Sequence, residues 1–381
     1  MPNGRAVTKN FGRWLLACTG IGCLIGLPFL PLKTQKVVAA HTEDGSVRIP
    51  LIDLDPACKA PSAELQADLA GIAQTIDGTA GIAVRRVGCS WVAGERLDRF
   101  FPQQSVSKLW VTLAALDAVD RQQARLEEAV TIGRDDLTLF NQPLRAAVLE
   151  RGQIQVPIAR LIYDAITHSD NTANDSLLRR VGGPDRIRQM LKEKGIGGVR
   201  FGPGERLLQS GIAGMTWNPE YSLGRNFDQA RAKLPMAERQ AALAKYIADP
   251  IDGATPSGMT QALSMLASEQ LLSPAATRYA LDTLAMTHSG PRRLKGGKPP
   301  EWKIYHKTGT GQILGPVSTG YNDVGILEAP DGARYAVAVM IGETRSPIPD
   351  RMAMMQGVTA AVTRHHDRTL GLGGGAITTA R

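Results

Sequence analysis

Cysteine and aromatic residues are scarce in this chain of 381 residues. It contains four cysteines and six histidines, and phenylalanine, tyrosine and tryptophan together make up 5 %. No cysteine or histidine cluster has the spacing that metal ligands require, so we expect neither a metal site nor a cofactor. Basic residues do not gather in stretches with aromatic residues between them, so we expect no nucleic-acid partner.

The net charge of +8 carries little information about partners. Residues 1–40 contain five lysines and arginines and no acidic residue, which leaves +3 for the rest of the chain. Hydrophobic residues make up 43 % and charged residues 21 %, as is usual for a globular protein with a sizeable core.

The N-terminus is typical of a signal peptide. A basic stretch ends at Arg13, an apolar run extends from Trp14 to Leu32, and Val38-Ala39-Ala40 is a small-residue cleavage site. We therefore expect an exported, periplasmic protein without stable membrane association after cleavage. An uncleaved membrane anchor is the main alternative, and a lipoprotein site at Cys18 is weaker because almost no apolar run precedes it.

Cleavage would leave two cysteines, Cys58 and Cys89, in the mature chain. An exported protein meets an oxidising compartment, which favours a disulfide between them. Two buried thiols are the alternative. The sequence alone does not decide between these two states.

Strand patterns occur near both ends of the chain, and helical patterns fill its middle. The expected strands are 80–87, 90–101, 302–306, 321–328 and 334–341. The expected helices are 61–76, 105–118, 157–167, 174–181, 184–194, 235–248, 260–268, 275–286 and 350–364. This order predicts one antiparallel sheet built from both ends, covered by the terminal helices, with an inserted helical subdomain.

Ser105 and Lys108 form a Ser-x-x-Lys pattern at the start of a predicted helix. Residues three apart share a helix face, so the lysine amine can reach the serine hydroxyl and take its proton. Backbone N–H groups at a helix N-terminus also stabilise an oxyanion. The pattern alone is weak evidence, because it also occurs by chance on ordinary solvated helices.

Two further motifs follow in order, Ser169-Asp170-Asn171 and Lys307-Thr308-Gly309. The hydroxyl of Ser169 can relay a proton to a leaving group, and the amide of Asn171 can hold an acyl group. Alone, this motif is equally typical of a helix N-cap. The lysine and threonine of the later motif can bind a substrate carboxylate, with the N–H of Thr310 as a second oxyanion donor. Its glycine permits a close approach of the backbone.

Together, the three motifs in this order are the signature of class A β-lactamases and penicillin-binding proteins. The chain resembles the class A serine β-lactamase family over about residues 60–366, also at Gly182-Gly183-Pro184 and Gly253-Ala254-Thr255-Pro256. The resemblance implies an α+β fold, in which helices flank an antiparallel five-stranded sheet and an all-α subdomain is inserted. It also implies hydrolysis of penicillin- and cephalosporin-type antibiotics through a serine acyl-enzyme, by a monomer.

The resemblance also implies domain boundaries. The signal peptide is 1–40, the catalytic domain is 41–366, and 367–381 is a disordered tail. Within the catalytic domain, the α/β part comprises about 55–102 and 289–366. The helical part comprises about 103–288, with an insertion at about 210–252 that the family pattern does not contain.

Glu205 separates the hydrolytic branch from its relatives. Glu205-Arg206-Leu207-Leu208-Gln209 resembles the loop whose glutamate activates the deacylating water in class A enzymes, and its offset from Ser169 matches the family. A surface glutamate is the alternative. The second interpretation of the chain is a D-alanyl-D-alanine peptidase or penicillin-binding protein. Such a protein lacks this base, so a β-lactam acylates its serine and the ester is not hydrolysed. A β-lactam-sensing module without turnover is a more remote third.

Several positions depart from the family pattern. Asp175 stands where an asparagine usually faces the glutamate, and two carboxylates in contact cannot both ionise cheaply. Gln209 replaces the usual loop amide, and Pro203-Gly204 replace a basic residue. We therefore expect a remodelled loop, with the insertion at the rim of the active site. Phe140 falls where the family often has an aromatic residue beside the cleft, with core packing as the alternative.

Overall fold

A computed structural model describes residues 40–41, 47–48, 58 and 60–371. Of the predicted signal peptide only Ala40 is among them, in a short pair of strands, β1 (Ala40–His41) and β2 (Val47–Arg48). Residues 372–381 of the predicted tail also lie outside the described part. Within the described ranges, no helix is both long enough and apolar enough to cross a membrane.

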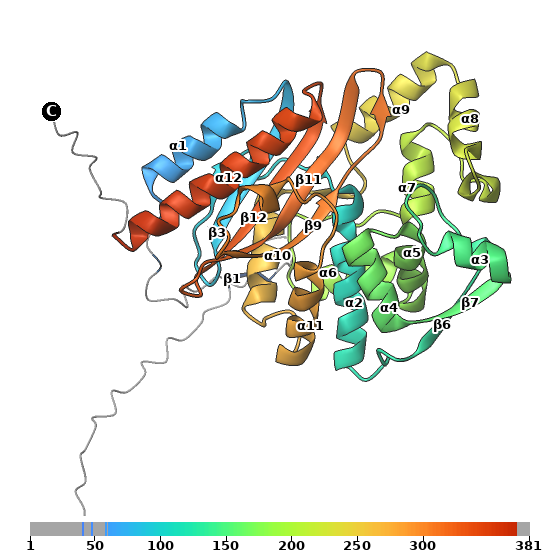
Figure 1. The fold of residues 1–381 in the computed structure, drawn as a ribbon, viewed down its shortest axis with the longest axis horizontal. Helices are drawn as coiled ribbons and strands as arrows, with labels where there is room; N and C mark the ends of the chain where they lie inside the picture. Colours follow the sequence, from blue (N-terminus) through green and yellow to red (C-terminus); the bar gives the residue numbers. More distant parts are fainter. Residues whose placement is uncertain (1–39, 42–46, 49–57, 59, 372–381) are drawn as a thin grey trace, which may run out of the picture.

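The predicted sheet is present and is built from both ends of the chain (Figure 1). Its main strands lie in the order β9, β11, β12, β3, β4, and each neighbouring pair is antiparallel. A two-residue strand, β10, pairs with the beginning of β11 as a sixth strand. Their bounds are β3 (Gly78–Arg86), β4 (Ala93–Glu95), β9 (Lys303–Gly309), β10 (Ile313–Leu314), β11 (Val317–Glu328) and β12 (Arg334–Thr344).

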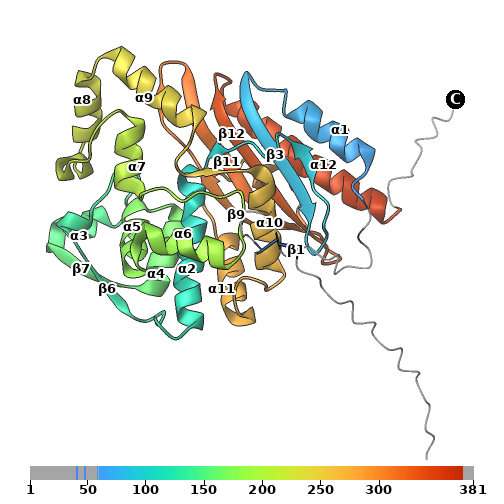
Figure 2. The ribbon, with the colours of Figure 1, turned by 180° about the vertical axis from the view of Figure 1, so that it is seen from behind.

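Both faces of the sheet are buried, which explains why β12 is apolar along most of its length. Val337, Val339 and Ile341 pack against α1 (Ala63–Ile72) and α12 (Ile348–Thr369), while the alternate residues belong to the core on the other face. α10 (Pro256–Ala267) lies on that second face, as the view from behind shows (Figure 2). Successive strand residues point to opposite faces, so one strand supplies both cores.

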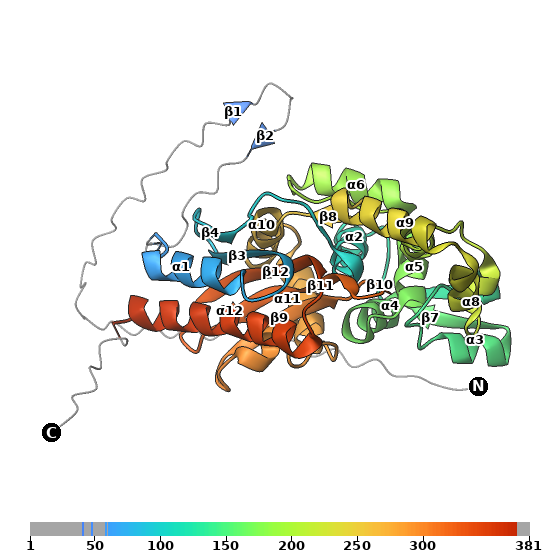
Figure 3. The same ribbon diagram turned by 90° about the horizontal axis from the view of Figure 1, so that it is seen from above.

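The helical part lies beside the sheet, with α2 between the two (Figures 1 and 3). α2 is buried almost all round, as its composition predicts. The helices here are α2 (Lys108–Asp120), α3 (Arg145–Arg151), α4 (Ile158–Tyr163), α5 (Asn171–Arg180), α6 (Gly183–Glu193), α7 (Glu205–Ile212), α8 (Asn226–Lys233), α9 (Met236–Ala248) and α11 (Pro274–Ala285). A small sheet, β6 (Ala129–Gly133) with β7 (Gln153–Pro157), completes it.

The expected strand at 90–101 and the expected C-terminal tail both differ from the structure. The segment 90–101 is not one strand, because Arg96 adopts a left-handed conformation (φ 50°) that ends β4. The chain then forms β5 (Phe101–Pro102), which pairs with β8 (Gly253–Ala254) outside the main sheet. At the other end, α12 continues to Thr369, three residues into the segment expected as a tail.

The disulfide is confirmed. Cys58 and Cys89 are bonded, with their Cα atoms 5.6 Å apart. Cys89 is completely buried in the turn between β3 and β4. The bond therefore fixes the chain ahead of α1 to the edge of the main sheet.

Candidate active site

Ser105 lies in a single 3-10 turn, Gln104–Ser107, that leads directly into α2. The turn replaces the α-helical start that the sequence suggested, but the relation to Lys108 is kept. The Nζ of Lys108 donates to the Oγ of Ser105 at 2.9 Å. The first N–H groups of a helix have no acceptor within it, so the N–H of Ser105 can donate to an oxyanion.

Lys108 is completely buried and joins three predicted site residues. Besides Ser105, its Nζ donates to the Oδ1 of Asn171 at 2.8 Å and to the carboxylate of Glu205. An ammonium has three donors, and these contacts use all of them. One cation therefore holds the nucleophile, an amide of the second motif and the loop glutamate in fixed relative positions.

Ser169 and Lys307 form a second contacting pair among the predicted site residues. Ser169 adopts a left-handed conformation (φ 59°) at the end of a π-helical turn, Asp164–His168. Its Oγ accepts a hydrogen bond of 3.0 Å from the Nζ of Lys307. Burial holds the pKa of Lys307 well below its usual range, and the nearby Lys108 and Arg293 cations lower it further. Such a pair can pass a proton to a leaving group.

Gly309 brings the end of β9 against the nucleophile turn. A Cβ at this position would lie 2.5 Å from the carbonyl oxygen of Gln103, so any side chain would push the strand away. Thr308 and Thr310 flank it, and the Oγ1 of Thr308 lies 2.5 Å from the Oγ of Ser289. The third motif and the nucleophile are therefore held together by backbone contact.

Arg293 is a site residue that the sequence did not reveal. Its Nη2 donates to the Oγ1 of Thr310 at 2.6 Å, and its Nη1 donates to the carbonyls of Gly309 and Asn322. The guanidinium also lies 3.8 Å from the centre of the Tyr321 ring. It precedes β9 in an irregular stretch with no periodic pattern, so the sequence around it offers no signal that could have marked it.

Phe140 lies at the rim of the site. Its backbone has a φ of 58°, and its side chain is half exposed and makes an edge contact, 5.0 Å between ring centres, with Phe227 of α8. Its two neighbours hold the second motif: Leu139 accepts from the amide of Asn171, and the amide of Asn141 donates to the carbonyl of Ser169. The segment predicted as an insertion, to which Phe227 belongs, therefore reaches Phe140.

Comparison with known proteins gives the family of this chain. The family model described as the β-lactamase enzyme family matches residues 63–366. The chain belongs to this family. Its curated relatives include β-lactamase VEB-1 of Pseudomonas aeruginosa, 24 % identical over 65 % of this chain and 72 % of that protein. A β-lactamase of Mycobacterium tuberculosis strain H37Rv is 27 % identical, over 73 % of this chain and 77 % of that protein.

Solved structures of class A β-lactamases have the same fold. The extended-spectrum β-lactamase TLA-1 superposes with a TM-score of 0.66 at 21 % identity, covering 80 % of this chain and 98 % of that one. An ancestral class A β-lactamase gives a TM-score of 0.62 at 27 % identity, covering 78 % and 98 %.

Glu205, the first residue of α7, is held through its backbone by Asp175 of α5. The backbone N–H of Glu205 donates to the Oδ1 of Asp175 at 3.1 Å. Burial, and next the charge of Glu205, raise the pKa of Asp175 to about 6. Gly204 makes this approach possible, because it has a φ of 97° and a Cβ there would lie 3.2 Å from Leu178. The two carboxyl-bearing residues are adjacent, as the sequence predicted.

Proposed function

We propose that this β-lactamase family member opens the β-lactam ring of penicillins and cephalosporins on Ser105 and then hydrolyses the resulting ester. The observation that supports it best is the shared position of two groups on the ammonium of Lys108. Ser105 Oγ and the Glu205 carboxylate both accept from that nitrogen. A serine that forms an ester and a base that can activate water for its hydrolysis are thus neighbours.

In the first stage, Ser105 Oγ attacks the lactam carbonyl carbon and gives up its proton either to Lys108, when that side chain is the neutral amine, or, through a water molecule, to Glu205. The N–H groups of Ser105 and Thr310 stabilise the oxyanion. The carbon–nitrogen bond then breaks, and the lactam nitrogen receives a proton from Ser169, whose hydroxyl is bonded to Lys307. The proton taken from Ser105 replaces the one that Ser169 gives up, so Lys108 and Glu205 return to their starting states. The ring is open and the acyl group is attached to Ser105.

In the second stage, Glu205 removes a proton from a water molecule that attacks the ester carbonyl. The ester bond to Ser105 breaks, the serine regains its proton, and the penicilloic acid leaves. Asn171, held by Lys108 and by Leu139, is placed to bind the acyl side chain. Thr308, Thr310 and Arg293 form a polar, cationic end of the site that fits the carboxylate of the substrate. Phe140 borders the acyl group at the rim.

Nitrocefin and benzylpenicillin test this function on purified protein. With nitrocefin we expect steady turnover. With benzylpenicillin we expect the mass of the protein to increase by one penicilloyl group on Ser105, and only while the reaction lasts. A D-alanyl-D-alanine peptidase of the same family would instead keep the adduct after free penicillin has been consumed. A stable adduct on the unmodified protein would therefore overturn the hydrolytic function.

We further propose that the protein is exported to the periplasm, is cleaved after Ala40 and acts as a monomer. The Cys58–Cys89 disulfide supports export, because such bonds persist in oxidising compartments. N-terminal sequencing of protein from the periplasmic fraction should begin at His41, and light scattering should give one chain per particle. An intact N-terminus retained in the membrane fraction would contradict the cleavage.

A further inference from the structure

Gln104, the residue before the nucleophile, has a backbone conformation that needs support. Its φ is 54°, in the left-handed region that residues with a side chain seldom adopt. Such a conformation is strained and persists only when the surrounding structure fixes it. Because the direction of Ser105 depends on this residue, whatever fixes Gln104 also aims the nucleophile.

Two buried residues far along the chain fix Gln104. Its backbone N–H donates to the Oδ2 of Asp252 at 2.8 Å, and its side-chain Nε2 donates to the Oη of Tyr246 at 2.6 Å. The Oη of Tyr246 in turn donates to the Oδ1 of Asp252 at 2.8 Å. The three residues thus form a closed triangle of hydrogen bonds. Gly320 packs on the remaining side, where a Cβ would lie 2.5 Å from the Gln104 side chain.

The triangle is held by neutral donors. Within the part of the chain that the structure describes, Asp252 makes no ion pair, and burial raises its pKa to about 6. Burial and the nearby Asp252 raise the pKa of Tyr246 well above its usual value, so the phenol keeps its proton. Tyr246 is therefore a constant donor to Asp252 and a constant acceptor for Gln104.

The same side chain of Gln104 continues the network to the loop glutamate. Its Oε1 accepts from the Nε2 of Gln209 at 2.9 Å, and that nitrogen lies 3.3 Å from the Oε2 of Glu205. Gln312, just before β10, donates to the carbonyl of Gln209 at 2.8 Å. A buried polar path therefore links Tyr246 to both the nucleophile turn and the deacylating base.

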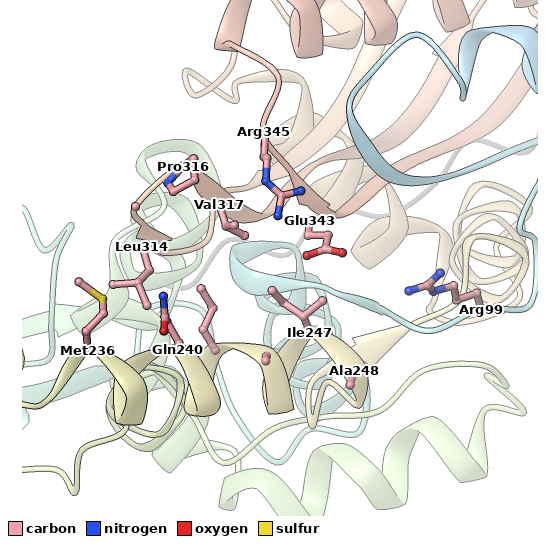
Figure 4. Close-up of a pocket in the computed structure, with 13 residues that line it drawn as sticks. Arg99, Met236, Gln240, Ile247, Ala248, Leu314, Pro316, Val317, Glu343 and Arg345 are labelled. Carbon is pink, nitrogen blue, oxygen red and sulfur yellow. The ribbon is translucent and has the colours of Figure 1, made fainter.

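Tyr246 belongs to α9, the main helix of the inserted segment. α9 packs through Leu243 and Tyr246 on Leu208 and Ile212 of α7. Leu314 and Val317, on either side of the turn between β10 and β11, also pack against this cluster, and a pocket of about 650 Å³ opens between α9 and that hairpin (Figure 4). Apolar packing therefore holds the ring of Tyr246 in place, and its phenol oxygen adds the polar contact with Gln104.

We propose that Tyr246 is a positioning residue for the β-lactamase reaction, through which the inserted segment holds Gln104 and so aligns Ser105 and Glu205. Tyr246 does not touch the reacting atoms. Its phenol acts through Gln104 on the nucleophile and through Gln104 and Gln209 on the base. The inference rests on the proposed function, since it assigns Tyr246 a part in acylation and deacylation.

Tyr246→Phe tests the proposal, because it removes the phenol oxygen and keeps the ring in its apolar cluster. We expect the acylation and deacylation rate constants to fall by about 10-fold or more, as small misplacements of reacting groups do. The dissociation constant of the non-covalent complex should not change. Stopped-flow measurements with nitrocefin give these constants, and the melting temperature of each variant is recorded alongside.

Tyr279→Phe is the matched control. It also removes a phenol hydrogen bond, 3.4 Å to the carbonyl of Ala159, but on α11, remote from this network. Its rate constants should equal those of the unmodified protein. In a double-mutant cycle, Tyr246→Phe and Gln104→Leu together should lose less than the product of the two single losses, because the two side chains share one hydrogen bond.

Three results would overturn the proposal: unchanged rate constants in Tyr246→Phe, a change confined to substrate dissociation, or losses that add fully in the double variant. The acylation rate is also measured by intact mass with benzylpenicillin. This acylation rate can still be measured if the unmodified protein is acylated but does not release product. A failure of the hydrolytic function is thereby distinguished from a failure of Tyr246 to position Ser105.

Discussion

The N–H of Glu205 and the carboxyl of Asp175 are joined by a hydrogen bond of 3.1 Å, which ties the catalytic loop to α5. This contact uses one oxygen of a fully buried acid. It keeps the loop in place, but the same burial penalises the charged form of the acid, whose pKa rises to about 6. The residue that holds the loop, Asp175, therefore favours its neutral, protonated form more than an exposed aspartate does.

Asp175→Asn should stabilise the protein at neutral and alkaline pH. As the pH rises from 4 to 6, the unfolded chain loses this proton before the folded chain does, so the carboxyl lowers stability through that window and above it. The amide keeps the acceptor for Glu205 and carries no charge. We expect a gain of about 2–3 kcal/mol at pH 8 that disappears below pH 4.

Urea unfolding of Asp175→Asn and of the unmodified protein, at pH 4 and at pH 8, measures this gain in the free energy of unfolding. Asp282→Asn, at an exposed position of α11, is the control and should change stability little at either pH. A gain of equal size at pH 4 and pH 8 would show that packing, and not ionisation, is responsible.

Glu205→Gln should trap the acyl-enzyme. The amide can still contact Lys108 but cannot accept a proton from water, so deacylation should slow by about 100- to 10,000-fold. Intact-mass measurement should then show a persistent penicilloyl adduct on Ser105. Glu238→Gln, exposed on α9, should release product at the normal rate. Normal release by Glu205→Gln would require a different base.

Arg293→Ala should weaken substrate binding more than turnover. The guanidinium is bonded to Thr310 at the cationic end of the site, and hydrogen bonds to charged groups contribute about 1.5–3 kcal/mol, or about 10- to 100-fold in KM. Steady-state kinetics with benzylpenicillin separate KM from kcat. The exposed neighbour Arg292 offers a close control, since Arg292→Ala should leave both constants unchanged. A loss in kcat alone would contradict carboxylate binding.

Removal of the disulfide should lower stability without affecting catalysis. The bond spans 31 residues, and closing a loop of that length in the unfolded chain corresponds to about 3–4 kcal/mol. Cys58→Ser with Cys89→Ser should therefore melt at a lower temperature by calorimetry, with kcat unchanged. Peptide mapping that finds both thiols free in the untreated protein would argue against the bond.

Much of the site was predictable because it depends on short sequence distances or on an ordered set of motifs. Ser105 and Lys108 are three residues apart, so one turn of chain brings them together whatever the rest does. Ser169 and Lys307 are 138 positions apart, and only the family resemblance indicated that they meet. The same holds for Glu205, whose spacing from Ser169 marked it.

The residues that the sequence did not identify are of a different kind. Gln104, Tyr246 and Asp252 are ordinary residue types in unremarkable local patterns, and they meet across 142 and 148 positions of chain. The sequence contains no periodicity or motif that pairs them. The strand expected at 90–101 failed for a local reason instead, since its alternation suggested extended chain but the left-handed Arg96 divides it.

Gln209 and Asp252 stand at the two ends of the inserted segment, and both contact Gln104. The predicted insertion is therefore a loop whose two ends are joined at the nucleophile turn. Doubling the length of a flexible closed loop costs only about 0.6 kcal/mol, so the number of residues between these points can change while Glu205 keeps its place. Between its two ends the loop brings Phe227 against the side chain of Phe140.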